Sequence, residues 1–372
     1  MADRAQALDL LCERVAQTHA ELPDGAWPYY ADPATGTWET VPDGDWCAGH
    51  WITGLHLAGL RTGQRALIDA ALGLTETIRP KAERHDMFRA PKFYYSAARL
   101  HATEGKPELR ALALDVANRM RAMAMPNGGM PIGNEVQVLT TTLSGPNVVA
   151  VDNVHPNLLL DWWAARETGD DRFVDGAIRH LDLTARDFVR ADGSTVEFIE
   201  YDPATGMQRR HFTLLGAHDD SCWSRGQAWA IGGYLRAWEE TREPRFLDTG
   251  LHLLDYYWDN AGDDHIPPWD FMDDAPFVDT SAAAIVAAQL ARLAVLDPNP
   301  EAQPAIDRLE PLLAGLCRHL TPTHAGDDRP PGMLLDGCFN HVKGFAEAHE
   351  LLWGDVYLLE ALYCLEAGGL PC

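Results

Sequence analysis

The chain lacks any long hydrophobic run. None of its apolar stretches approaches the roughly 20 residues that a membrane-spanning helix needs, although hydrophobic residues make up 46% of the 372 positions. The opening segment leads directly into a charged amphipathic helix near residues 5–20, without the positive start and apolar middle of a signal peptide. We therefore expect a soluble, cytoplasmic protein with no membrane partner.

Basic residues are also scarce. Lys and Arg total 30 against 55 Asp and Glu, so the formal net charge is −25, and no basic stretch compensates for it. Such a chain repels nucleic acid and anionic lipid, which excludes both as expected partners. If the ligand is itself acidic, its site must be locally positive.

Familiar cofactor and metal motifs are missing. The seven cysteines show no CxxC spacing, which argues against a disulfide framework and a structural zinc site. The histidines show no HxH or HExxH spacing, and neither a GxSxG motif nor a glycine-rich phosphate loop occurs. We expect an enzyme that uses neither metal nor cofactor.

What the chain does have is a repeated pattern. Five turns of similar composition separate pairs of apolar-periodic segments, at 60–63, 103–107, 167–171, 240–244 and 296–300. A small, aromatic-rich segment precedes each turn, at 46–60, 91–102, 156–167, 223–240 and 279–296. A more charged amphipathic segment follows, at 64–83, 106–124, 171–190, 244–260 and 300–320. The unit is a helical hairpin, and helices near 5–20 and 351–367 bring the total to six of each kind.

Loop lengths choose between an open solenoid and a closed ring. The returns from charged to apolar helices are long, at 21–45, 125–155, 191–222, 261–278 and 321–350, whereas the turns are tight. Only 136–151 and 194–200 within them are candidates for short strands. Neither chain end shows a polar capping repeat, which favours the ring. We predict an all-α (α/α)6 barrel forming a single domain over 1–372, with its pocket at the N-terminal ends of the inner helices.

Polar and aromatic residues precede every predicted inner helix. They are Asp45, Trp46, His85, Asp86, Asp152, His155, His218, Asp219, Asp220, Arg225, Gln227, Trp269, Asp270, Asp279, His349, Glu350, Trp353 and Asp355. Taken singly, an Asp before a helix is usually an N-cap and a Trp is usually core. Gathered at one end of a ring, aromatic rings with carboxylates and amides are typical of a carbohydrate site.

Asp86 and Asp152 are the best candidates for an acid/base pair. One carboxylate raises the pKa of the other until it holds a proton near neutrality. A helix N-terminus acts in the opposite direction, since it stabilises the anion. Desolvation or repulsion between the carboxylates must therefore outweigh the helix.

Several motifs resemble those of the unsaturated glucuronyl hydrolases, glycoside hydrolase family 88. The similarity spans most of the chain and is carried by Trp46 with Trp51, His85-Asp86, Val151-Asp152, and the segments 158–164, 220–229, 279–284 and 353–361. The Arg-Gly-Gln-Ala-Trp sequence at 225–229 separates it from the rhamnogalacturonyl hydrolases, whose counterpart looks more like Arg-Gly-Asn-Gly-Trp. A rhamnogalacturonyl-type activity remains an alternative.

The resemblance implies an (α/α)6 barrel that removes a terminal 4,5-unsaturated uronic acid from lyase-generated acidic oligosaccharides. Members hydrate the C4=C5 enol ether and need no metal. Asp152 matches the acid/base, and Asp86 matches a second carboxylate that holds sugar hydroxyls. Sugar-contacting positions are matched by Trp46, His85, Gln227 and Trp229.

The uronate needs positive partners, for which the candidates are Arg89, His155, His218 and Arg225. Arg225 can equally pair with Asp219 or Asp220 and brace its helix. Two departures from the family pattern, Met87-Phe88-Arg89 after Asp86 and one extra residue in 153–157, bear on substrate identity. Competing hypotheses are a sugar isomerase or epimerase using His218 and His349, and a non-catalytic scaffold. The sequence carries no signal for oligomeric state.

Overall fold

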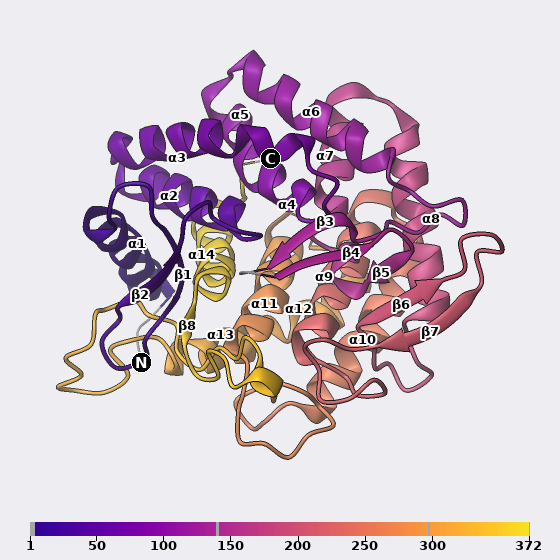
Figure 1. Cartoon of the computed structure of the whole chain (residues 1–372). Helices are drawn as coiled ribbons and strands as arrows, with labels where there is room; N and C mark the ends of the chain where they lie inside the picture. The colour runs from indigo at the N-terminus through magenta and orange to yellow at the C-terminus, as the bar shows by residue number, and fades with distance from the viewer. Residues whose placement is uncertain (1–3, 139–140, 297, 372) are drawn as a thin grey trace.

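The computed structural model describes residues 4–138, 141–296 and 298–371. Its inner helices are α2 (Ala48–Thr62), α4 (Arg89–Phe93) continued through the π-helical turn η2 (Tyr94–Ala98) into α5 (Arg99–Glu104), α7 (Leu158–Thr168), α9 (Ser224–Thr241), α11 (Thr280–Leu296) and α14 (Leu352–Ala367). Its outer helices are α1 (Arg4–Glu21), α3 (Arg65–Ile78), α6 (Pro107–Arg121), α8 (Asp171–Asp187), α10 (Pro244–Asn260), and α12 (Gln303–Ile306) with α13 (Leu309–Arg318). Figure 1 shows these helices arranged around the centre of the molecule, which confirms the predicted (α/α)6 barrel.

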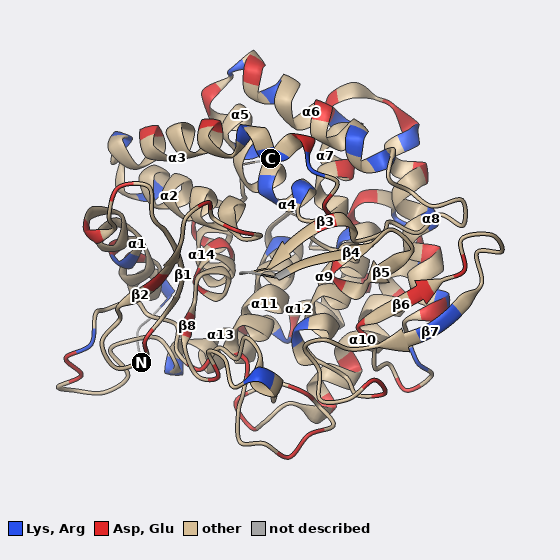
Figure 2. Cartoon of the chain, in the orientation of Figure 1, with Lys and Arg blue, Asp and Glu red and all other residues tan. Residues whose placement is uncertain are grey.

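The composition of each helix follows from its layer. The inner helices are surrounded on every side, so α2 is buried without a break from Ala48 to Gly59. An outer helix such as α3 buries only one stripe, made by Leu67, Ile68, Ala71, Thr75 and Ile78. This three- and four-residue spacing is that of an amphipathic helix. In Figure 2 the charged residues lie mostly on the outer helices and loops, with the inner helices largely uncharged.

The tight turns share one conformation at the end of the inner helix. Gly63, Gly105, Gly169 and Arg242 all adopt the left-handed region, with φ of 71°, 63°, 67° and 61°. Such a residue satisfies the last helical carbonyls and reverses the chain. The next helix then begins with an Asp170 cap or a proline at Pro107 or Pro244. The turn at 296–300 includes Asp297, which lies outside the described residues.

Short strands occupy the long returns at the opposite end of the ring. One sheet has the order β2 (Trp38–Val41), β1 (Trp27–Ala31), β8 (Glu350–Leu351). The hairpin β3 (Gly133–Val138)–β4 (Thr141–Gly145) forms a second, and β5 (Val148–Ala150), β6 (Phe198–Tyr201) and β7 (Gln208–Phe212) form a third. The remaining short helical turns are η1 (Arg79–Glu83), η3 (Val151–Val154), η4 (Pro300–Ala302) and η5 (His341–Lys343).

The strand prediction was incomplete. The segments 136–151 and 194–200 contain the second half of β3, all of β4 and β5, and most of β6, with residues 139–140 outside the described part of the chain. Four further strands, β1, β2, β7 and β8, were missed. Pro28 interrupts β1, β7 is mostly polar, and β8 has two residues, so none shows the apolar alternation that marks a strand.

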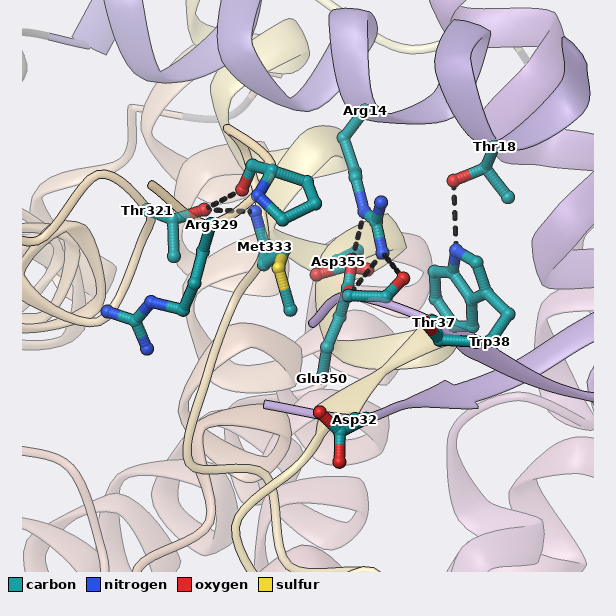
Figure 3. A network of polar contacts seen from close by, with 12 residues as sticks. Arg14, Thr18, Asp32, Thr37, Trp38, Thr321, Arg329, Met333, Glu350 and Asp355 are labelled. Atoms are coloured by element: carbon teal, nitrogen blue, oxygen red, sulfur yellow. Dashed lines mark hydrogen bonds and ion pairs between the residues drawn. The ribbon is translucent and has the colours of Figure 1, made fainter. Parts of the chain in front are cut away.

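A buried ion pair closes the ring where the two ends of the chain meet. Arg14 of α1 donates to Glu350 Oε1 at 2.8 Å and Oε2 at 2.6 Å, and also to the Gly36 carbonyl (Figure 3). Asp355 lies beside this pair, and burial together with the Glu350 anion raises its pKa well above the usual range. Glu350 and Asp355, which the sequence placed among the pocket residues, therefore take part in the closure of the barrel.

Among the helices of the described residues, none is both long and apolar enough to cross a membrane.

Candidate active site

Asp152 is held at the end of a β-ladder. Strands β5 and β6 pair with Ala150 opposite Phe198, and the ladder ends with Val151 N donating to the Glu197 carbonyl at 2.9 Å. The chain then turns into η3, against which α9 packs closely. A Cβ on Gly233 of α9 would lie 2.3 Å from the Val154 carbonyl oxygen, so only glycine allows this approach.

The carboxyl group of Asp152 has an unusual environment. Its Oδ1 is out of contact with solvent and has no hydrogen-bond partner among the described residues. Burial, followed by repulsion from Glu197, raises the pKa of Asp152 to about 7, while Arg225 opposes the rise. Asp152 is thus poised to hold and release a proton near neutrality, as a general acid requires.

Asp86 lies on a neighbouring segment. The chain at His85 and Asp86 runs against Gly133, whose φ is 104° and whose Cβ, if present, would lie 2.3 Å from the His85 carbonyl oxygen. Met87 N donates to the Ile132 carbonyl, and Ile132 N donates to the Val148 carbonyl, both at 2.8 Å. Backbone hydrogen bonds through Ile132 therefore connect the Asp86 segment to the strand that leads into Asp152.

The carboxyl group of Asp86 is paired. The residue is 1% exposed, its Oδ2 lies 3.0 Å from Lys92 Nζ, and its Oδ1 accepts a hydrogen bond from Phe88 N at 2.7 Å. A cation and a backbone donor both stabilise the charged form of a buried carboxylate. Lys92 was not predicted from the sequence. The available signal was a lysine within an otherwise small and aromatic inner segment.

Aromatic side chains line the neighbouring part of the ring. Trp46, which is 8% exposed, donates from Nε1 to the Tyr29 hydroxyl at 2.9 Å. Its ring lies 4.8 Å from that of Trp353 and 5.5 Å from that of the partly exposed Phe88. His85 is partly exposed, and its Nδ1 accepts from Asn134 N at 3.2 Å. Trp46, Phe88 and Trp353 thus form an aromatic wall, and Phe88 joins this wall to the His85–Asp86 turn.

Arg225 lies at the start of α9 and is 2% exposed. Its Nη1 forms an ion pair with Asp279 and donates to the Cys338 carbonyl, and its Nη2 donates to the Phe339 carbonyl at 2.9 Å. The ion pair is therefore with Asp279 and not with Asp219 or Asp220, the partners considered from sequence. The pairing ties α9 to the start of α11.

Other residues predicted to contact the sugar lie in different surroundings. Gln227 donates from its amide to the Gly193 and Leu253 carbonyls, at 2.7 and 2.9 Å, as part of the framework. Trp229 is 3% exposed and packs its ring against His155 and Tyr357, inside the barrel. His218 is exposed, in the loop before α9.

The structure also bears on the residues that were predicted to offer positive charge to a uronate. Burial lowers the pKa of His155 to about 3, so its imidazole is neutral. Arg89 contacts the Ala82 carbonyl and Met123 Sδ, at 3.3 and 3.0 Å, so it faces the outer layer. Burial also lowers the pKa of His349, whose ring lies against Tyr30. Neither His155 nor Arg89 is placed as a free cation for a uronate.

Two observations concern alternative sites. Within the described ranges, no group of three or more His, Cys, Asp or Glu side chains has the arrangement of a metal site.

A cavity of about 380 Å³ lies between α6 and α8, lined by Arg121, Arg172 and Arg179 among others. It belongs to the outer layer and none of the residues described above lines it.

The known proteins to which the chain is similar are unsaturated glucuronyl and unsaturated chondroitin disaccharide hydrolases. No family model matches the chain. The unsaturated chondroitin disaccharide hydrolase of Streptococcus pneumoniae is 26% identical over 348 residues, 90% of this chain and 85% of that protein. The unsaturated glucuronyl hydrolase of Bacillus sp. strain GL1 is 28% identical over 342 residues, 87% of each. A Streptococcus pyogenes unsaturated chondroitin disaccharide hydrolase is 29% identical over 261 residues, 69% of this chain and 64% of that protein.

Solved structures agree. The unsaturated glucuronyl hydrolase of Bacillus sp. GL1 superimposes with a TM-score of 0.86 at 25% identity, covering 98% of this chain and 97% of that one. An unsaturated glucuronyl hydrolase variant in complex with dGlcA-Glc-Rha-Glc gives the same values. A heparin-specific enzyme of the same name has a TM-score of 0.85 at 21% identity, which shows the fold.

Proposed function

We propose that this chain, like the unsaturated glucuronyl hydrolases of glycoside hydrolase family 88 that it resembles, removes a terminal 4,5-unsaturated uronic acid from acidic oligosaccharides left by polysaccharide lyases. The observation that carries this proposal is the contrast within the site. Asp152 has a pKa of about 7 and a carboxyl oxygen to which no residue of the described ranges donates, and the segment hydrogen-bonded to its strand carries the Asp86–Lys92 ion pair.

In this proposal Asp152 begins the reaction as an acid. It gives its proton to C4 of the enol ether, and positive charge develops at C5, where the ring oxygen stabilises it. Water adds to C5 and returns a proton to Asp152. The hemiketal formed at C5 opens, the glycosidic bond is lost, and the enzyme is restored.

We assign Asp86 the role of a permanent anion. Lys92 and the Phe88 amide stabilise its charge, so it is suited to accept hydrogen bonds from sugar hydroxyls rather than to exchange protons. The wall formed by Trp46 and Phe88 offers an aromatic surface for the apolar face of the sugar. Both roles position the substrate for proton transfer from Asp152.

The relatives suggest which substrates to try. The streptococcal relative carries unsaturated chondroitin disaccharide as the substrate in its name. One of the solved structures contains a dGlcA-terminated oligosaccharide. The departures after Asp86 and Asp152 flank the proposed catalytic residues. We therefore expect this chain to prefer one member of such a panel, and not all of them equally.

The test is to incubate the protein with lyase-generated unsaturated disaccharides and record the ultraviolet absorbance of the conjugated double bond. We expect the absorbance to disappear as two products form. Interconversion of intact free sugars would instead indicate an isomerase or epimerase. Inertness toward every unsaturated uronide would contradict the proposal.

A further inference from the structure

Glu197 is a buried carboxylate that the sequence analysis did not single out. It directly precedes β6 and is 5% exposed. Its Oε2 accepts hydrogen bonds from Leu214 N at 2.8 Å, from Leu215 N at 3.0 Å and from the Thr213 hydroxyl. Burial raises the pKa of Glu197, and the three donors on one oxygen oppose this rise by stabilising the charged form of the carboxyl group. Its Oε1 is buried and has no hydrogen-bond partner among the described residues.

The β-ladder places Glu197 next to the turn that carries Asp152. Ala150 pairs with Phe198, and one step further Val151 N donates to the Glu197 carbonyl. The two side chains share one feature, a buried carboxyl oxygen with no partner in the described structure. Two negative charges in a region poor in water repel strongly, so the pair favours a state with one proton.

Hydrogen bonding decides which residue takes that proton. Glu197 has three donors on Oε2, whereas no described residue donates to Oδ1 of Asp152. The anion is therefore more stable on Glu197, and the proton on Asp152. The positive charge of Arg225 in α9 favours the Asp152 anion, but Asp279 already pairs with that guanidinium.

Two histidines near this turn are neutral. His155, on the loop just after η3, and His180, on the adjoining helix α8, both have pKa values lowered to about 3 by burial. Neither carries charge at neutral pH, so neither offsets the effect of Glu197.

We propose that Glu197 is a positioning residue of this active site: a fixed, buried anion that keeps the proton on Asp152 until the substrate takes it. The use of that proton in hydrolysis rests on the proposed function. The arrangement of the two carboxylates does not, and it can be tested without substrate.

The first experiment is a titration of the substrate-free protein, with the Asp152 carboxyl carbon followed by NMR and assigned by its loss in Asp152→Asn. We expect a midpoint near 7 in the unaltered protein. Glu197→Gln removes the charge, while the amide oxygen can still accept from Thr213, Leu214 and Leu215. The midpoint should fall by about one pH unit or more.

A matched control is Glu200→Gln. Glu200 lies on the same strand but is paired with Arg210 at 2.8 Å near the surface, so its loss should leave the Asp152 midpoint unchanged. Should Glu197→Gln fail to fold, Thr213→Val weakens the support of the Glu197 anion and should move the midpoint in the same direction, by less. An unaltered midpoint in the folded variant would overturn the proposal.

Activity provides the second measurement. In Glu197→Gln the alkaline limb of the kcat profile should move to lower pH, with roughly tenfold less activity at pH 7 and recovery toward pH 5. Glu197→Asp keeps the charge and should restore much of the profile. If no unsaturated uronide is hydrolysed, the proposed function fails, while the titration still decides the role of Glu197.

Discussion

Two carboxylates on adjoining segments of one site have opposite environments. Asp86 is held by Lys92 at 3.0 Å and by a backbone amide at 2.7 Å. Asp152 has Glu197 as a like-charged neighbour and an oxygen with no hydrogen-bond partner in the part of the chain that the structure describes. Residue type and position before an inner helix are the same for both. We therefore propose that the contacts of each carboxyl group set its chemistry, with Asp86 as an anion and Asp152 as a proton carrier.

The largest effect should come from Asp152→Asn. The amide is nearly isosteric but cannot deliver a proton, so turnover of an unsaturated disaccharide should fall about 100- to 10,000-fold. Because the substitution breaks no hydrogen bond to Oδ1 among the described residues, thermal stability should be maintained or slightly raised. A loss of less than tenfold, with the melting temperature unchanged, would remove Asp152 from its role.

Asp86→Asn should reduce turnover severely and, unlike Asp152→Asn, also reduce stability. Lys92 would remain buried without a counterion, a situation that costs about 3–5 kcal/mol when one partner of a buried pair is removed. Thermal denaturation of the two single variants gives the comparison directly. The double variant should lose far less activity than the product of the two single effects. Equal melting temperatures of Asp86→Asn and Asp152→Asn would refute the contrast between a paired Asp86 and an unpaired Asp152 oxygen in the described structure.

Arg225→Met tests a third buried charge. Since Arg225 pairs with Asp279 and two backbone carbonyls, we expect a stability loss of a few kcal/mol, with a smaller change in KM. Asp219→Asn and Asp220→Asn serve as controls, because both side chains are exposed and neither pairs with Arg225. A sharply raised KM for the unsaturated uronide with an unchanged melting temperature would instead make Arg225 the uronate receptor.

The last prediction concerns pH. Asp152 must be protonated to act, and its pKa is about 7, so activity should decline above that pH. Its folded pKa lies above the usual value of about 3.9, so the native state binds the proton more tightly. The resulting stability is complete below about pH 4 and is lost as pH rises to 7. Melting temperatures across this window should fall less in Asp152→Asn than in the unaltered protein.

Local signals were enough to predict the barrel. Left-handed turn residues such as Gly63 and Gly169 act within one helical turn, and the alternation of buried and amphipathic helices is a periodicity that can be counted along the chain. The polar, proline-bearing or two-residue strands were missed because their stability comes from pairing with distant segments, such as Tyr30 with Leu351. Their own sequences therefore carry little signal.

The sequence also placed Asp86, Asp152 and Arg225 before or at the start of inner helices, because that position follows from the helix pattern alone. Their partners were decided by the tertiary structure. Asp279 lies 54 residues from Arg225 in the chain, and Glu197 meets the Asp152 turn across a β-ladder. A pKa depends on burial and on charges within a few ångströms. Residues far apart in sequence supply both, so only the folded chain distinguishes the paired carboxylate from the protonated one.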